Sequence, residues 1–178
     1  VPTPAERSTY VLTTGLVLAL LCWQWQPIPG VVWHVENDIG KALLQALFWL
    51  GWVILFASTF MINHFDLFGL RQVYLRLKSQ PYRPVPFVQA ALYRFVRHPI
   101  MLGVLIGFRA TPSMSVGHLL FAVVMTGYVF FGIYLEEHDT LQALGETYAR
   151  YRRATPMIVP LPRRKSPDVK PIDSARAR

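Results

Sequence analysis

ALLQALFWLGWVILFASTFMIN, residues 42–63, is a continuous apolar run without a charged residue. Its length matches the roughly 20 residues that a helix needs to cross the hydrocarbon core of a bilayer. Residues 8–25 (STYVLTTGLVLALLCWQW) form a second such run, and residues 110–135 form a longer one that contains Pro112 and His118. These runs predict an all-α fold, that of a polytopic integral membrane protein.

The last apolar run is too long for one straight crossing. Its segment Thr111-Pro112-Ser113-Met114-Ser115 is typical of a turn, which predicts a membrane helix over residues 116–136. The shorter apolar segment 99–108 is expected to belong to a tilted helix that begins near Ala90. Together the segments predict about four transmembrane helices, followed by a cytoplasmic C-terminal helix.

The composition agrees with a membrane location. The chain of 178 residues is 53% hydrophobic and only 16% charged, although its formal net charge is +8. A basic nucleic-acid-binding domain carries many Lys and Arg on a soluble fold, so we expect no nucleic-acid partner. Cys22 is the only cysteine, which excludes an intramolecular disulfide and a cysteine-rich zinc site. No metal-ligand motif is present, and a soluble helical protein is the less favoured alternative.

The basic residues indicate how the chain is oriented. Most of the 18 Lys and Arg residues lie in residues 64–98 or after Asp139, whereas loop 26–40 contains Glu36 and Asp38 and no Lys or Arg. The positive-inside rule then places the two basic stretches in the cytoplasm. We therefore predict an integral membrane protein whose loop 64–98 and C-terminal tail face the cytoplasm. Contact of the same charges with anionic lipid headgroups is a secondary possibility.

Polar residues gather just after the run 42–63. His64, Asp66 and Arg71 follow one another closely there. A plain helix exit with solvated charges is one interpretation. The other is a His/Asp pair at the mouth of a cavity, able to take a proton. The sequence leaves both open.

A second polar group comprises Arg97, His98 and Pro99. Pro99 suits the first turn of a helix, where its missing N–H costs nothing. Arg97 could bind a carboxylate with two hydrogen bonds. The alternative is an arginine whose charged end reaches the membrane surface while its stem stays in the lipid.

A third group closes the last apolar run. Glu136 and Glu137 are adjacent carboxylates, which cost desolvation at a membrane boundary unless a cation or a hydroxyl-rich ligand is their partner. Glu137, Tyr148 and Tyr151 fall on one face of a predicted continuous helix. Solvated acidic residues and an interfacial aromatic anchor are the plainer interpretations.

Two of these motifs resemble a known superfamily. R-H-P at 97–99 with Gly103, and E-E-x-x-x-L-x-x-x-G-x-x-Y-x-x-Y from Glu136 to Tyr151, resemble the isoprenylcysteine carboxyl methyltransferases and phospholipid methyltransferases. These are integral membrane enzymes that use S-adenosylmethionine. INHFDLFGLRQVYL (62–75), TPSMSVGHLLFA (111–122) and the segment RRATPMIVP resemble a narrower group, the bacterial enzymes that methylate methanethiol to dimethyl sulfide.

The resemblance implies S-adenosylmethionine as the cofactor and assigns roles to named residues. Together with the charge asymmetry it implies a location in the bacterial inner membrane, with the active site facing the cytoplasm. The residues implied to line, bind or cover it are Arg97, His98, Pro99, Gly103, Glu136, Glu137, Tyr148, Tyr151 and Arg152. The two glutamates are alternatives for its ribose or amino end. The resemblance further implies additional N-terminal helices, so residues 1–162 are expected to be a transmembrane methyltransferase domain that lacks them. Residues 163–178 are predicted to be a disordered basic tail.

Methylation of a small thiol requires that the S–H proton be removed, because the thiolate is the nucleophile. We predict His64 or Asp66 as the base and Arg71 as an electrostatic helper, with His98 as the competing base. The thiol can arrive through the lipid bilayer. Other functions stay open at this point: carboxyl or phospholipid methylation within the superfamily, and a non-catalytic, denitrification-associated membrane protein.

Overall fold

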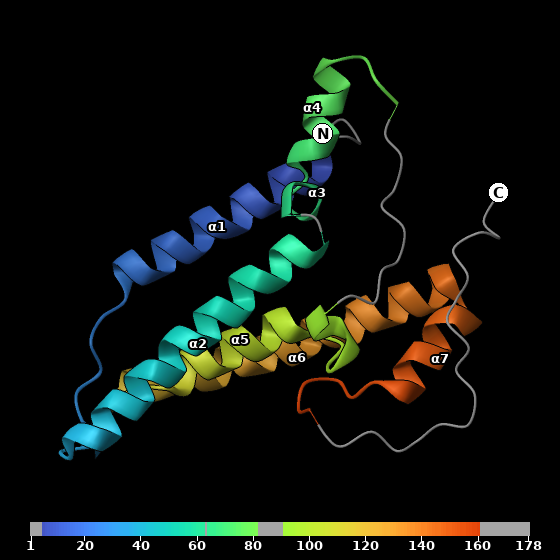
Figure 1. Ribbon diagram of the computed structural model, residues 1–178. Helices are drawn as coiled ribbons and strands as arrows, with labels where there is room; N and C mark the ends of the chain where they lie inside the picture. Colours follow the sequence, from blue (N-terminus) through green and yellow to red (C-terminus); the bar gives the residue numbers. More distant parts are fainter. Residues whose placement is uncertain (1–4, 63, 82–90, 161–178) are drawn as a thin grey trace.

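The computed structural model describes residues 5–62, 64–81 and 91–160 and is mostly helical (Figure 1). In chain order its elements are α1 (Glu6–Gln24), β1 (Val31–His34), α2 (Asp38–Ile62), α3 (His64–Leu67), α4 (Leu70–Leu77), η2 (Ala91–Arg94), α5 (Pro99–Arg109), β2 (Ser113–Ser115), α6 (Val116–Leu144) and α7 (Glu146–Ala154). The strands β1 and β2 correct the all-α prediction. The predicted disordered tail lies outside the described residues.

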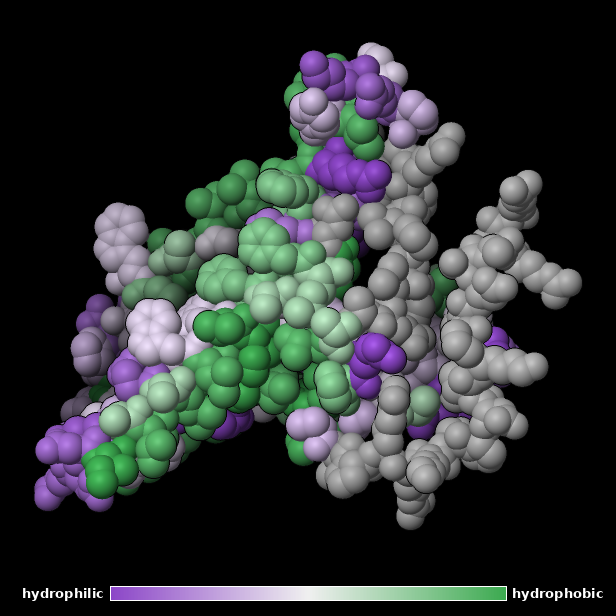
Figure 2. Space-filling model, viewed as in Figure 1, coloured by the Kyte–Doolittle hydropathy of each residue, from purple (hydrophilic) through white to green (hydrophobic). Residues whose placement is uncertain are grey.

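In the described part of the chain, two helices are long and apolar enough to cross a membrane by length and composition: α2 and α6. Their large apolar side chains point outward, as in Phe60 (65% exposed) and Phe131 (62% exposed). Figure 2 shows apolar surface along the helices and polar surface at their ends. Soluble monomers rarely expose such extended apolar patches, so these faces suit lipid rather than water.

Most helix boundaries predicted from the sequence lie within a few residues of the observed ones. The apolar run 8–25 forms α1, which is about 28 Å long at 1.5 Å per residue. The helix predicted over 116–136 begins at Val116, where Ser115 Oγ accepts a hydrogen bond from the backbone N–H of His118 over 3.1 Å. It continues beyond the predicted end to Leu144.

The prediction of a tilted helix that begins near Ala90 is wrong. Ala90 itself lies outside the described residues, but residues 91–94 form the short 3-10 helix η2 and α5 begins only at Pro99. A residue before proline avoids the helical region, and His98 has φ −123° and ψ 65°. As a result α5 spans about 16 Å, roughly half of a bilayer.

Helices α2 and α5 pack with their backbones in contact. A Cβ atom added at Gly103 would lie 2.5 Å from the carbonyl oxygen of Gly51 and 2.8 Å from the backbone nitrogen of Leu55. Glycine at the crossing point lets two membrane helices approach this closely. The short α5 is thereby held along α2 (Figure 1).

The sheet joins two loops at one end of the molecule. β1 and β2 are antiparallel and pair Val31 with Ser115 and His34 with Ser113. The backbone N–H of Val35 donates to the carbonyl oxygen of Pro112 over 2.9 Å. The loop before α2 and the turn before α6 therefore lie on the same side, as the predicted orientation requires. The polar groups predicted as functional lie toward the other end.

The prediction of one continuous helix from Glu137 to Tyr151 is also wrong. Gly145 has φ +53°, a conformation that favours glycine, and it separates α6 from α7. The chain after α7 then returns to the start of α5, where the backbone N–H groups of Arg97 and His98 donate to Pro156 and Met157 over 2.9 and 3.0 Å. This return brings α5, α6 and α7 together at one site.

Candidate functional site

A buried ion pair forms the centre of the site. Arg97 Nε donates to Glu137 Oε1 over 2.7 Å, and both side chains are less than a tenth exposed. Arg97 precedes α5, whereas Glu137 lies near the end of α6. Buried charges persist only when they are paired and hydrogen-bonded, so this pair ties the two helices together. It joins the R-H-P and E-E motifs that the sequence assigned to one site.

His98 lies between the two adjacent glutamates. Its Nε2 is 3.1 Å from Glu137 Oε1, and its Nδ1 is 3.6 Å from Glu136 Oε2. The two carboxylates differ in exposure: the side chain of Glu137 is 8% exposed, and that of Glu136 is 59% exposed. Glu137 therefore has protein partners on the inside, while Glu136 keeps a solvent-facing carboxylate.

Helix α7 closes the site through its last turn. Arg152 Nε lies 3.3 Å from Glu137 Oε2 and its side chain is about half exposed. Arg97 Nη1 donates to the carbonyl oxygens of Arg152 and Thr155 over 2.8 and 2.6 Å. The last carbonyls of a helix have no hydrogen-bond partner within it, and here the buried guanidinium of Arg97 donates to two of them. We refer to Arg97, His98, Glu136, Glu137 and Arg152 as the ionic cluster.

Two tyrosines of α7 pack beside the ionic cluster. Tyr148 and Tyr151 are both buried, and their rings tilt against each other at 5.9 Å. Burial, and then the Glu137 carboxylate, raises the pKa of Tyr148 to about 12. Burial also raises the pKa of Tyr151, whose hydroxyl donates to the carbonyl oxygen of Tyr93 over 2.7 Å. Both hydroxyls therefore stay protonated at neutral pH.

The remaining residues predicted for the cofactor lie nearby on α5 but do different things. Pro99 is buried in the first turn of α5, as its ring requires. Gly103 is buried one turn further along, at the contact with Gly51. Its observed role is close helix packing, and a role in lining the cofactor stays a prediction.

The predicted catalytic residues form a second group, on α3 and α4 at the end of α2. His64 Nδ1 lies 2.9 Å from Thr59 Oγ1, and its ring stacks on Phe60 with centroids 4.6 Å apart. Asp66 is buried, and its Oδ1 lies 3.4 Å from Arg71 Nη1. We refer to Thr59, His64, Asp66 and Arg71 as the His64 cluster.

The two clusters are linked through α2. Tyr93 Oη donates to the backbone carbonyl of Ser58 at 3.5 Å, and Tyr93 in turn accepts from Tyr151. Ser58 precedes Thr59 of the His64 cluster on α2, and both residues are buried, with 0% and 3% exposure. Thr59 and Thr155 were not predicted from the sequence, and Tyr93, which opens the polar stretch before Pro99, was given no role of its own. Only the hydroxyl pair Ser58-Thr59 inside an apolar run was a usable signal, because buried hydroxyls need partners.

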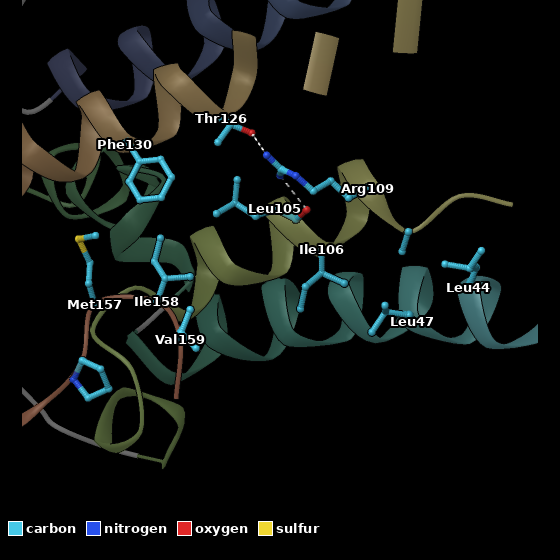
Figure 3. Close-up of a pocket in the computed structure, with 12 residues that line it drawn as sticks. Leu44, Leu47, Leu105, Ile106, Arg109, Thr126, Phe130, Met157, Ile158 and Val159 are labelled. Carbon is cyan, nitrogen blue, oxygen red and sulfur yellow. Dashed lines mark hydrogen bonds between the residues drawn. The ribbon is translucent and has the colours of Figure 1, made fainter. Parts of the chain in front are cut away.

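An open groove of about 670 Å³ is lined by residues that belong to neither cluster. Apolar side chains of α2, α5 and α6 and of segment 156–159 line it (Figure 3). Among its lining residues the charged one is Arg109, which donates to Thr126 Oγ1 over 2.5 Å and to the Leu105 carbonyl over 3.3 Å. Such a lining suits an aliphatic group rather than a polar cofactor. None of the predicted site residues lines it.

Fold and site together define a helical membrane protein with a buried ionic cluster at one end of its apolar helices. Curated proteins similar to the chain identify its family. It is 54% identical over 164 residues to a protein of Mycobacterium tuberculosis named methanethiol S-methyltransferase, covering 92% of the chain and 67% of that relative. A protein of the same name from Crocosphaera subtropica is 49% identical over 166 residues, with 93% and 65% covered. The chain belongs to the methanethiol S-methyltransferase family.

The chain spans about two thirds of the length of these relatives. A more distant relative, a Nurim homolog of Drosophila pseudoobscura pseudoobscura, is 32% identical over 142 residues, with 76% of the chain and 56% of that protein covered. No family model matches the chain. No solved structure matches it.

Proposed function

We propose that the chain methylates methanethiol to dimethyl sulfide at the membrane, with S-adenosylmethionine as the methyl donor. The observation that carries the proposal is the ionic cluster, in which Arg97 and Glu137 meet at 2.7 Å. It unites the two motifs that resemble the superfamily's cofactor site. The names of the relatives support a methyl-transfer reaction on a small thiol.

The residues of the ionic cluster fit this cofactor, whose methionine part carries an ammonium and a carboxylate. Glu137 is occupied by Arg97, His98 and Arg152, so it holds the cluster together rather than the ligand. Glu136 has a mostly exposed carboxylate for the ammonium or a ribose hydroxyl. The half-exposed Arg152 suits the cofactor's carboxylate. When bound, S-adenosylmethionine supplies an electrophilic methyl group on a positively charged sulfur.

His64 is the better candidate for the base that takes the thiol proton. Asp66 is buried and paired with Arg71, and His98 Nε2 contacts Glu137. His64 is only half-buried and lies among aromatic rings that suit a small apolar thiol. Arg71 adds positive charge nearby, which favours a thiolate.

The proposed membrane arrangement has four crossings, made by α1, α2, residues 91–109 and α6. In the third crossing the short helix α5 covers about half of the bilayer, and residues 91–98 with η2 cover the rest. Both clusters then lie at the cytoplasmic side of the bacterial inner membrane. The pairing of β1 with β2 supports this arrangement, because it joins the acidic loop to the turn before α6. Apolar methanethiol can reach the site from the lipid.

The test measures dimethyl sulfide in the headspace over membranes that contain the full-length protein, supplied with methanethiol and S-adenosylmethionine. We expect Glu136→Gln to raise the KM for the cofactor at least about tenfold, since one charge-assisted contact is worth ~1.5–3 kcal/mol. Glu146→Gln is the matched control, because Glu146 is an exposed glutamate of α7 that pairs with Arg153. Folded protein that forms no dimethyl sulfide would refute the proposal. Methyl label recovered in lipid or protein instead would favour the other superfamily activities.

A further inference from the structure

We propose that Thr59 is a positioning residue that holds His64 in the tautomer protonated on Nδ1, so that Nε2 is the atom that accepts the thiol proton. The functional half of this inference rests on the proposed methyl transfer. The tautomer itself does not, and it can be measured without turnover.

The hydrogen bonds of one hydroxyl determine the tautomer. Thr59 Oγ1 donates to the carbonyl oxygen of Phe56 over 2.8 Å, within α2. A hydroxyl has a single proton, so toward His64 the same oxygen can only accept. His64 Nδ1 lies 2.9 Å from it and must therefore be the donor. In a neutral imidazole with the proton on Nδ1, the lone pair is on Nε2.

Burial makes this arrangement effective. Thr59 is only 3% exposed, so water does not compete for its hydroxyl. The His64 ring stacks on Phe60 at an interplanar angle of 11° and tilts against Phe68 with centroids 4.7 Å apart. Two aromatic contacts and one hydrogen bond hold the plane and the rotation of the ring. Nε2, on the edge away from Thr59, is then presented in one orientation.

This geometry gives the proton a defined path. The S–H bond of the thiol breaks, its proton goes to His64 Nε2, and the electron pair stays on sulfur. The thiol sulfur then forms a bond to the methyl carbon as the carbon–sulfur bond of the sulfonium donor breaks. The electrons of that bond neutralise the sulfonium charge. The imidazolium of His64 afterwards releases its proton to water, so the balance needs no further reactant.

The experiment combines nitrogen NMR of the full-length protein, labelled with ¹⁵N-histidine, with steady-state kinetics. Loss of one signal pair in His64→Gln identifies the resonances. We expect a protonated Nδ1 and an unprotonated Nε2 in the wild type, a mixture of tautomers in Thr59→Val, and the wild-type pattern in Thr59→Ser. In Thr59→Val, kcat should fall on the order of tenfold with an unchanged KM for S-adenosylmethionine, since general-base catalysis contributes ~10²–10⁴. Thr59→Ser should restore kcat.

Ser58→Ala is the matched control, because Ser58 is the adjacent buried hydroxyl and donates to Ile54 rather than to a histidine. It should leave the His64 tautomer unchanged. A proton on Nε2 in the wild type overturns the proposal, and so does a folded Thr59→Ser protein as slow as Thr59→Val. Full activity of His64→Ala would refute the base role. Absence of dimethyl sulfide from the wild type would instead refute the proposed function. The NMR result on the His64 tautomer does not depend on that outcome.

Discussion

The ionic cluster and the His64 cluster lie toward the same end of the molecule but are built differently. In the ionic cluster, Arg97 at the start of α5 binds partners on α6 and at the end of α7 that are 40 to 58 positions away in sequence. The side-chain contacts within the His64 cluster are local and join residues only five positions apart, from Thr59 to Arg71. The cluster also has a long-range tie to a backbone atom, where Arg7 Nη1 donates to the carbonyl oxygen of Asp66 over 3.3 Å. Long-range buried charges hold elements in place, whereas the local cluster presents one ring. We therefore expect damage to the first to unfold the protein and damage to the second to stop chemistry.

The largest expected effect is the loss of the buried carboxylate. Glu137→Gln leaves Arg97 buried without its closest charged partner, and breaking such a pair costs about 3–5 kcal/mol. The melting temperature in detergent should fall on the order of 10 °C. His64→Gln should change it by much less. Equal losses of stability in the two variants would remove the distinction between the clusters.

A somewhat smaller effect is expected at the helix crossing that places both clusters. Gly103→Val would push side-chain atoms into the backbone of Gly51, and overpacking typically costs about 1–3 kcal/mol. Gly132→Ala on α6 is the control, because nothing lies within 4 Å of its added Cβ. Thermal unfolding compares the two. A stable Gly103→Val protein would contradict the close contact of α2 and α5.

A substitution at the turn before α7 should affect the ionic cluster and leave the His64 cluster unchanged. Gly145 has φ +53° and nothing within 4 Å of an added Cβ, so Gly145→Ala strains the backbone without a clash. Strain of this kind costs about 1–3 kcal/mol. Because α7 carries Arg152, binding of S-adenosylmethionine should weaken, while the His64 NMR signals stay in place. Calorimetric titration measures the binding, and altered His64 signals would show that the clusters are not separate.

The smallest effect concerns alkaline pH. The pKa of Tyr148 is about 12 in the folded protein against 10.0 ordinarily, because burial and Glu137 disfavour the phenolate. Between these values the folded state keeps a proton that the unfolded state releases. Its contribution to stability is therefore complete below pH 10 and is lost as the pH rises toward 12. Melting temperature measured against pH should decline less steeply in Tyr148→Phe; identical slopes would contradict this.

The sequence predicted the long apolar helices α1, α2 and α6, because apolar runs of bilayer length have few other stable solutions. It also placed Arg97 and Glu137 in one site, although it could not tell Glu136 from Glu137. It missed the break at Gly145, since the spacing from Glu137 to Tyr151 fits one continuous helix face. The two tyrosines are nevertheless buried, on a separate helix.

The residue types and their order determine which segments are apolar, where charge is permitted, and which chemistry the polar groups can supply. Only the tertiary structure decides which charges meet. Glu137 is enclosed and Glu136 is exposed because α7 turns back at Gly145 and Arg97 lies beneath it. Thr59 looks like one more residue of a membrane run, and its role appears only when the hydroxyl is found beside His64. Hydrogen bonds depend on angstrom distances between side chains, which no one-dimensional pattern contains.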